Sequence, residues 1–139
     1  AFDTKIEVVY AAPSEKFKNK NLHKEKIILT VSSIDPRKNL ERAIKAFNGL
    51  DSEYKLVIVG QKNKTFSKVG FNSTDLSKNV IFTGYLSDEK LIDLYNRSEL
   101  FIYASLFEGF GIPPLEAQAC GCACIISNAT SLPEVYKTS

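Results

Sequence analysis

The stretch KIILTVSSIDPRKNLERAIKAFNGL, residues 26–50, reads as a strand, a loop and a helix in succession. Its first six residues form a short apolar run rich in β-branched side chains, which is typical of a buried strand. Asp35 stands directly before Pro36, and this pair predicts the capped start of a helix. Further on, five apolar residues recur at helical spacing, so they form one stripe that can pack against a sheet. They are Leu40, Ala43, Ile44, Phe47 and Leu50.

The same alternation of apolar runs and helical patterns continues along the chain. Four more runs predict strands at residues 54–59, 79–83, 100–103 and 123–127. Ser87 caps a predicted helix between two of these runs. Apolar strands that alternate with helices belong in a parallel sheet that is covered on both faces and joined by right-handed crossovers. The predicted fold is therefore α/β, a doubly wound parallel sheet of the Rossmann-like type.

One domain is predicted, over residues 26–139. Residues 1–25 contain an apolar run at 6–10 and a lysine-rich polar stretch, so we expect a linker together with a further strand. Ser131 begins a capping box, yet the chain ends within the helix that it predicts, and we expect a domain truncated at its carboxyl end. The polar stretch 61–79 is compatible with either a short helix or a loop.

Composition excludes several classes of function. The 139 residues are 44% hydrophobic, which is enough for one domain with a buried core. Eighteen basic and 16 acidic residues leave a net charge of +2, far from the basic excess of a nucleic-acid-binding domain. No apolar run approaches the ~20 residues of a membrane-spanning helix, and the start has no signal-peptide pattern. A cytoplasmic protein is predicted.

Three cysteines lie close together, at Cys120, Cys122 and Cys124. An odd number without a distant partner argues against a disulfide framework and for a reducing compartment. A zinc site needs about four ligands, and His23, the one histidine, lies far away in the predicted linker. We therefore expect no metal site, and we expect the cysteines to pack in the core.

In an open parallel sheet, ligands bind beyond the carboxyl ends of the strands. The loop after the first predicted strand places Arg37 and Lys38 in the first turn of a helix, where the helix dipole disfavours cations. A bound anion such as a diphosphate would offset this cost. The alternative is that both cations pair with Glu41 along the helix. Their position at a strand end favours the anion site.

The loop after the strand at 100–103 runs into a helix with the sequence EGFGIPPLE, from Glu108 to Glu116. Its glycines permit a tight turn and a close approach of a ligand to the backbone. Two prolines at the start of the helix leave the N–H groups of Leu115 and Glu116 free for an anion. Phe107 and Phe110 beside this turn are expected to anchor the loop in the core.

The two carboxylates of this loop are the second group of site candidates. Glu116, in the first turn, can accept hydrogen bonds from a vicinal diol such as a ribose, while Glu108 lies nearer a sugar. The alternative is that Glu116 is an ordinary first-turn acid and Glu108 an ordinary loop residue. Spacing alone leaves both interpretations open.

The sequence from Glu108 to Glu116 resembles the E-x7-E motif of the family 4 retaining glycosyltransferases, whose GT-B fold consists of two facing Rossmann-like domains. The similarity covers most of the chain in order. It also includes residues 35–39, 56–60, 80–85, 117–121 and 131–135.

This resemblance implies that the donor diphosphate binds Lys38 and the backbone amide of Leu115. Many family members have Gly-Arg where this chain has Ser32-Ser33, and that arginine normally helps to hold the diphosphate. Arg37 is expected to substitute for it.

The resemblance also implies that Glu108 is the catalytic candidate and that Glu116 binds the ribose hydroxyls. The transferred sugar is expected to lie against one loop. The residues of that loop are Glu108, Gly109, Phe110 and Gly111. The base is expected to lie beside Gly84, Tyr85 and Leu86.

The implied activity is transfer of a hexose from a nucleotide diphosphate sugar to an acceptor hydroxyl, with retention at the anomeric carbon, as in polysaccharide biosynthesis. No metal or other cofactor is expected. The acceptor, a glycan or a lipid-linked sugar, is expected to bind an amino-terminal domain of the same enzyme, and nucleic acid is not an expected partner. The full-length enzyme is expected in the cytoplasm or at the inner membrane face. The chain alone is expected to bind nucleotide without transferring sugar.

Two alternatives stay open at this point. One is a non-catalytic α/β module that binds a nucleotide or another protein, in which the acidic and basic pairs serve only as helix caps and surface ion pairs. The other is a GT-B nucleotide-sugar epimerase, which shares the fold and the class of ligand.

Overall fold

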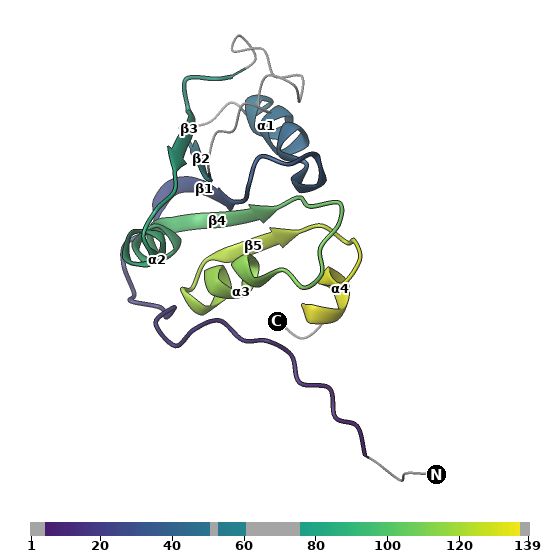
Figure 1. Ribbon diagram of the computed structural model, residues 1–139. Helices are drawn as coiled ribbons and strands as arrows, with labels where there is room; N and C mark the ends of the chain where they lie inside the picture. The colour runs from purple at the N-terminus through teal and green to yellow at the C-terminus, as the bar shows by residue number, and fades with distance from the viewer. Residues whose placement is uncertain (1–4, 51–52, 61–75, 137–139) are drawn as a thin grey trace.

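The computed structural model describes residues 5–50, 53–60 and 76–136 (Figure 1). Strands alternate with helices along the chain, as the apolar runs predict. The elements are β1 (Glu25–Val31), the 3-10 turn η1 (Pro36–Lys38), α1 (Leu40–Asn48), β2 (Lys55–Val59), β3 (Val80–Gly84), α2 (Asp88–Arg97), β4 (Ser98–Tyr103), α3 (Ile112–Ala119), β5 (Ala123–Ile126) and α4 (Leu132–Val135). The undecided stretch 61–79 lies mostly outside the described residues.

The five strands form one parallel sheet in the order β3-β2-β1-β4-β5. The chain moves outward from β1 to β3, returns to the middle at β4, and moves outward again to β5. This order confirms the doubly wound, Rossmann-like prediction. It also makes β1 and β4 neighbours at the position where the strand order reverses, which is where a ligand crevice opens in such sheets.

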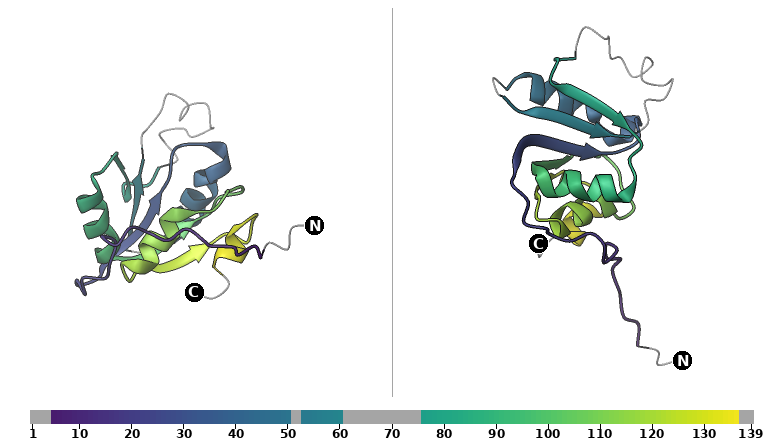
Figure 2. Two further views of the ribbon diagram at one scale, coloured as in Figure 1. Left: turned by 60° about the horizontal axis from the view of Figure 1, so that its bottom comes forward. Right: turned by 90° about the vertical axis from the view of Figure 1, so that its left-hand side faces the viewer.

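Each face of the sheet carries its own hydrophobic core. Ile44 and Phe47 of α1 pack with strand residues such as Leu56 on one face. On the other face, Tyr95 of α2 and Ala117 of α3 pack around Phe101. Figures 1 and 2 show α1 on the opposite side of the sheet from α2 and α3. The central strands are thus buried on both faces, which explains why their sequences are apolar throughout.

The edge strands depart from this pattern. In β3 and β5, exposed and half-buried residues alternate along the strand. Ile125 of β5 is 57% exposed. The prediction of a sheet covered on both faces is therefore wrong for these two edge strands. One face of each strand is covered, and no described helix packs on the other.

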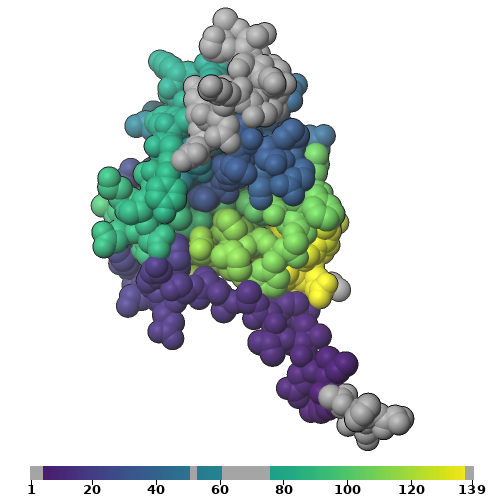
Figure 3. Space-filling model, viewed as in Figure 1, coloured from purple at the N-terminus to yellow at the C-terminus, as the bar shows by residue number. Residues whose placement is uncertain are grey.

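Residues 6–10 do not form a strand, so that expectation is wrong. The segment is extended and its apolar side chains are exposed, and no strand of the described sheet pairs with it. Figure 3 shows it as a tail that leaves the body of the domain. Further along, Phe17 is buried against Tyr95, and the side chain of Asn96 binds the backbone at Lys18 and Lys20.

The cysteines pack in the core, as expected. Cys120 ends α3, and Cys122 Sγ donates to the carbonyl oxygen of Ser98 at 3.4 Å. Burial raises the pKa of Cys122 to about 11 and that of Cys124 to about 12, so both thiols stay protonated at neutral pH. Within the described residues, no group of three or more His, Cys, Asp or Glu side chains is arranged to hold a metal ion.

None of the helices in the described ranges is both long enough and apolar enough to cross a membrane.

The ends of β1 and β2 touch through Gly60. The N–H of Ser32 donates to the carbonyl of Val59 at 3.0 Å, and Gly60 donates to the carbonyl of Gly84 at 3.1 Å. A Cβ atom at Gly60 would lie 2.0 Å from the carbonyl oxygen of Ser32. Only a residue without a side chain fits here, so Gly60 sets how closely the two strands approach beside the crevice.

We predict that Gly60→Ala lowers the free energy of unfolding by about 3 kcal/mol, because the new methyl group forces the strand ends apart. Chemical denaturation measures this value. Gly109→Ala is the matched control, since a Cβ there meets nothing within 4 Å. Equal stability of the two variants would contradict the close packing of Gly60 on Ser32.

Candidate functional site

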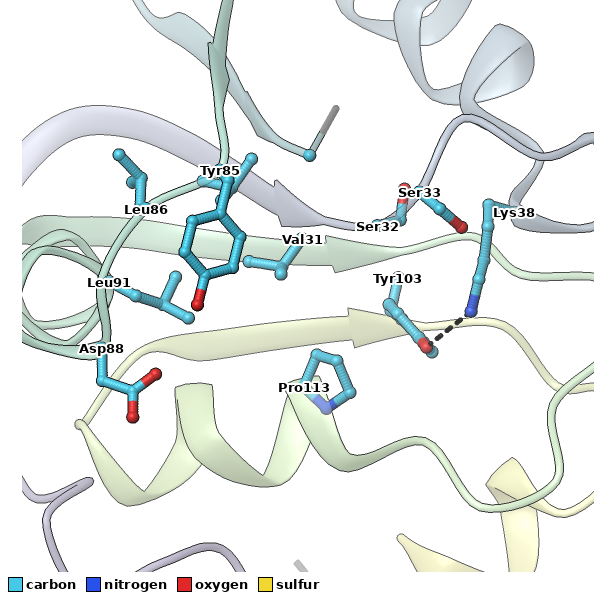
Figure 4. Close-up of a pocket in the computed structure, with 12 residues that line it drawn as sticks. Val31, Ser32, Ser33, Lys38, Tyr85, Leu86, Asp88, Leu91, Tyr103 and Pro113 are labelled. Carbon is cyan, nitrogen blue, oxygen red and sulfur yellow. Dashed lines mark hydrogen bonds between the residues drawn. The ribbon is translucent and has the colours of Figure 1, made fainter. Parts of the chain in front are cut away.

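A cavity of about 480 Å³ opens at the carboxyl ends of the strands (Figure 4). Its two ends differ in chemistry. One end is polar and is formed by Ser32, Ser33, Lys38 and Tyr103. The other end combines apolar, aromatic and acidic side chains from the loop after β3 and from α2, namely Tyr85, Leu86, Asp88 and Leu91. The cavity therefore suits an elongated ligand with one anionic end.

The 3-10 turn η1 positions the cations of the first loop. Asp35 caps this turn by accepting from the N–H of Arg37 at 2.8 Å, as its position before Pro36 predicts. Asn39 then adopts a left-handed conformation, with φ of 53°, and α1 begins only after it. Arg37 and Lys38 thus end a short turn and do not occupy the first turn of α1, so the helix-dipole argument for an anion does not apply to them.

Two hydrogen bonds tie the β1–α1 loop to the β4–α3 loop. The backbone N–H of Leu106 donates to the carbonyl of Arg37 at 2.7 Å. The side-chain amide of Asn39 donates to the carbonyl of Ala104 at 3.1 Å. Loops that lie about 65 residues apart in the sequence are therefore held side by side at the carboxyl edge of the sheet.

Lys38 and Glu108 form an ion pair across these two loops. Lys38 Nζ lies 2.6 Å from Glu108 Oε1 and 3.3 Å from the hydroxyl of Tyr103. The Lys38 side chain is 17% exposed and that of Glu108 is 12% exposed. The ammonium group also lies 5.5 Å from the centre of the Tyr103 ring. Removing one partner of so buried a pair is costly, because the other charge is left without compensation.

A third loop holds the backbone of Glu108. Thr130 and Ser131 both donate from their hydroxyls to the carbonyl of Glu108 at 3.0 Å, and the Glu108 N–H donates to Thr130 at 3.1 Å. Ser131 stands at the start of α4 as predicted, but its hydroxyl makes this contact and does not cap the helix. The sequence signal for this clamp is weak, since the partners lie 22 and 23 residues apart.

The environment of Glu108 favours the ionised carboxylate. Partial burial raises its pKa, but hydrogen bonds from Lys38, Ser105 and Tyr103 outweigh burial, and the pKa lies below its usual value. The pKa of the Tyr103 phenol is raised, first by burial and then by the neighbouring Glu108 carboxylate. Glu108 is thus an anion and Tyr103 a neutral phenol at physiological pH.

Arg37 does not reach the cavity. Its guanidinium makes two hydrogen bonds of 3.1 Å to the carboxylate of Asp35, and its side chain is 62% exposed. The alternative pairing of Arg37 and Lys38 with Glu41 is absent too, since Glu41 accepts from Lys45 at 2.7 Å.

The start of α3 differs from the expectation. Gly111, with φ of 91°, stands before a helix that begins at Ile112, so Glu116 lies in the second turn. The amide of Leu115 hydrogen-bonds the hydroxyl of Tyr136, which in turn donates to the carbonyl of Gly111. The Leu115 amide is therefore engaged within the domain and does not face the cavity.

Glu116 lies against α2. Its Oε2 accepts from the hydroxyl of Tyr95 at 3.2 Å, and burial raises its pKa above the usual value. The structure therefore separates the two acids of the motif, because Glu108 contacts the cation of the cavity and Glu116 contacts the phenol of Tyr95.

The remaining predicted site residues lie in two places, the loop after β3 and the glycine turn before α3. Tyr85 and Leu86 line the cavity, whereas the carbonyl of Gly84 is taken by Gly60. In the glycine turn, Gly109 is exposed, and Phe110 is half-buried and tilted against Tyr10 at 6.2 Å. Phe107 is exposed, so the expectation that both aromatics anchor the loop in the core is wrong for this residue.

Several residues that line the cavity were not predicted from the sequence. Ser32 and Ser33 entered only as a departure from a motif, and Tyr103, Asp88 and Pro113 had no assigned role. Their position in the chain is the signal that could have identified them. Each lies at the carboxyl end of a strand or in the first turn of the helix that follows.

We predict that Glu108→Gln is less stable than the wild type by about 3 kcal/mol at pH 7, because Lys38 loses its buried counter-charge. The pKa of Glu108 is lowered by folding, so its contribution is present above about pH 4.5 and is lost as the pH falls further. Denaturation curves of both proteins between pH 7 and 3 should therefore converge at low pH. Glu89→Gln, on the exposed surface of α2, controls for the loss of one carboxylate. A stability difference between Glu108→Gln and the wild type that does not change with pH would contradict a stabilising Lys38–Glu108 ion pair.

Comparisons with known proteins agree with this architecture. Residues 12–138 match the family described as Glycosyl transferases group 1. The serotype-specific mannosyltransferase WbdA of Escherichia coli is 41% identical over 133 residues, which cover 87% of this chain and 16% of WbdA. The chain thus spans about one sixth of the length of this relative.

Two solved structures show the same fold. HepE of Anabaena, in complex with UDP and glucose, aligns with a TM-score of 0.71 and 21% identity, over 80% of this chain and 32% of HepE. The C-terminal domain of LpcC, a glycosyl transferase group 1 family protein of Francisella tularensis, aligns with a TM-score of 0.63 and 26% identity, over 88% of this chain and 70% of that domain. Since the family match spans nearly the whole chain, the protein belongs to the glycosyl transferases group 1 family.

Proposed function

We propose that this chain is the donor-binding domain of a family 4 retaining glycosyltransferase. In this proposal it holds a nucleotide diphosphate sugar, and the whole enzyme transfers the hexose to an acceptor hydroxyl. Family membership supports the reaction class, and the names of the relatives, a mannosyltransferase and a structure with bound UDP and glucose, support the class of donor.

The position of Lys38 carries the proposal. Among the described residues that line the cavity, Lys38 is the one cation, and it lies at the polar end. A diphosphate placed there accepts hydrogen bonds from its ammonium group. The nucleoside then extends towards Tyr85 and Leu86 at the other end, where an aromatic ring and apolar side chains suit a flat base.

Lys38 also suits the charge that the reaction creates. The bond between the anomeric carbon and the diphosphate oxygen breaks, and both electrons go to the diphosphate. The acceptor oxygen bonds to the same carbon, and its proton passes to the departing diphosphate. A fixed ammonium group beside the leaving diphosphate stabilises the developing charge, so the proposal needs no metal ion.

Glu108 is the proposed catalytic residue at the sugar. It lies next to Lys38, so it borders the junction between diphosphate and sugar. In the proposal, the backbone of residues 109–111 and the side chain of Phe110 complete this part of the site. Because Glu108 and a diphosphate compete for the same ammonium group, donor binding requires the carboxylate to turn from Lys38 towards the sugar hydroxyls.

The outer contacts of the proposed site need local rearrangement. Arg37 and the Leu115 amide can reach the diphosphate only after leaving Asp35 and Tyr136. Glu116 can bind a ribose diol in place of the Tyr95 hydroxyl. An acceptor glycan or lipid-linked sugar is proposed to bind a separate amino-terminal domain, in a cytoplasmic enzyme.

We predict that Lys38→Gln lowers the affinity for a nucleoside diphosphate about tenfold or more, because the charge-assisted hydrogen bond to phosphate is lost. Gln keeps a hydrogen-bond donor for Glu108, and thermal unfolding of the ligand-free variant shows whether the domain remains folded. Isothermal titration with UDP, GDP and ADP measures the effect. Lys45→Gln, on the exposed face of α1, is the matched control and should bind like the wild type. Equal affinities of the two variants would rule out Lys38 as the phosphate ligand.

We further predict opposite effects of Glu108→Gln on binding and on turnover. The variant should bind the nucleoside diphosphate more tightly, since Lys38 no longer has a competing anion. Sugar transfer by the full-length enzyme should fall about 100-fold or more, because a catalytic contact is lost. Titration and a product assay measure the two quantities. Weaker diphosphate binding by the variant would contradict the competition for Lys38.

A further inference from the structure

The glycine turn before α3, residues 109–111, begins and ends with glycine. Gly109 is exposed, and a Cβ atom there would meet nothing within 4 Å. Glycine has more backbone conformations available than any other residue, so ordering such a turn costs conformational entropy. Contacts from other segments of the fold therefore decide where Phe110, between the two glycines, is placed.

The loop before α4 and the residue that follows it hold the backbone on both sides of Phe110. Thr130 and Ser131 donate from their hydroxyls to the carbonyl of Glu108, each at 3.0 Å. The hydroxyl of Tyr136 donates to the carbonyl of Gly111. These hydrogen bonds fix the ends of the turn, but they do not act on the side chain in its middle.

Tyr10 of the amino-terminal tail contacts both the turn and α4. Its ring centre lies 6.2 Å from that of Phe110, with the two planes at 34°. Its hydroxyl donates to Oε1 of Glu134, which lies in α4 and 124 residues further along the chain, at 2.7 Å. Figures 1 and 2 show the tail running past α3 and α4. One side chain thus links the middle of the glycine turn to the helix beside its ends.

We infer that Tyr10 is a positioning residue for the donor sugar, because it holds Phe110 and the glycine turn in the conformation that receives this sugar. This inference rests on the proposed function, in which residues 108–111 border the transferred sugar. Tyr10 itself lies outside that site and acts through Phe110. A turn that is already ordered loses less freedom when a ligand binds. The contact therefore strengthens binding of the sugar and leaves binding of the diphosphate at Lys38 unchanged.

The test compares Tyr10→Ala with the wild-type chain on two kinds of ligand. Isothermal titration measures the affinity for UDP-glucose and GDP-mannose, and for UDP and GDP, which lack the sugar. Tyr10→Ala should bind the nucleotide sugars about fivefold more weakly and the nucleoside diphosphates as tightly as the wild type. Tyr10→Phe keeps the ring against Phe110 and should recover part of the lost affinity. A purely structural role would change both kinds of ligand alike.

Val9→Ala is the matched control. Val9 is the neighbour of Tyr10 in the same tail, and it is 87% exposed. This variant should bind all four ligands like the wild type. Thermal unfolding of the ligand-free variants shows that each one is folded.

Each other outcome overturns the inference. If Tyr10→Ala binds the nucleotide sugars as tightly as the wild type, Tyr10 does not position the turn, and the proposed function stands. If it loses affinity for the nucleoside diphosphates to the same degree, its effect is not specific to the sugar. An equal loss in Val9→Ala would assign the effect to the tail as a whole. If the wild type binds neither kind of ligand, the proposed function fails together with the inference.

Discussion

The ion pair between Lys38 and Glu108 is the constraint on which the candidate site depends. It joins the loop after β1 to the loop after β4, the two strands that flank the reversal of strand order. Both side chains are mostly buried, so neither charge can be left alone without a cost of about 3 kcal/mol or more. An anion that binds Lys38 must therefore exchange with this contact.

The arrangement gives the site a balanced charge before any ligand binds. Lys38 is compensated by Glu108, Arg37 by Asp35, and the Leu115 amide by the hydroxyl of Tyr136. Each group that could bind an anion thus has an internal partner that can be displaced.

Sequence reasoning predicted the fold well because the fold depends on patterns that a chain carries locally. Apolar runs of four to six residues gave the central strands, and Asp35 before Pro36 gave the capped turn. The errors occur where a segment has the right local pattern but no strand or helix of the described fold packs against it. Residues 6–10 have the composition of a strand, but no described strand pairs with them, and no described helix covers Ile125.

The site was predicted only in part, because its contacts join residues far apart in the sequence. Lys38 and Glu108 were both named as candidates, but nothing in the spacing of 70 residues shows that they bind each other. Similarly, the helix after Gly111 begins earlier than its prolines suggested, which moves Glu116 to the second turn. Side-chain partners of this kind follow from tertiary packing.

The most direct measurement is a crystal structure of the chain with a bound nucleoside diphosphate. The account predicts that the diphosphate lies at the polar end of the cavity, within hydrogen-bond distance of Lys38 Nζ, and that Glu108 has turned away from this group. A diphosphate bound elsewhere, with the Lys38–Glu108 pair intact, would contradict it.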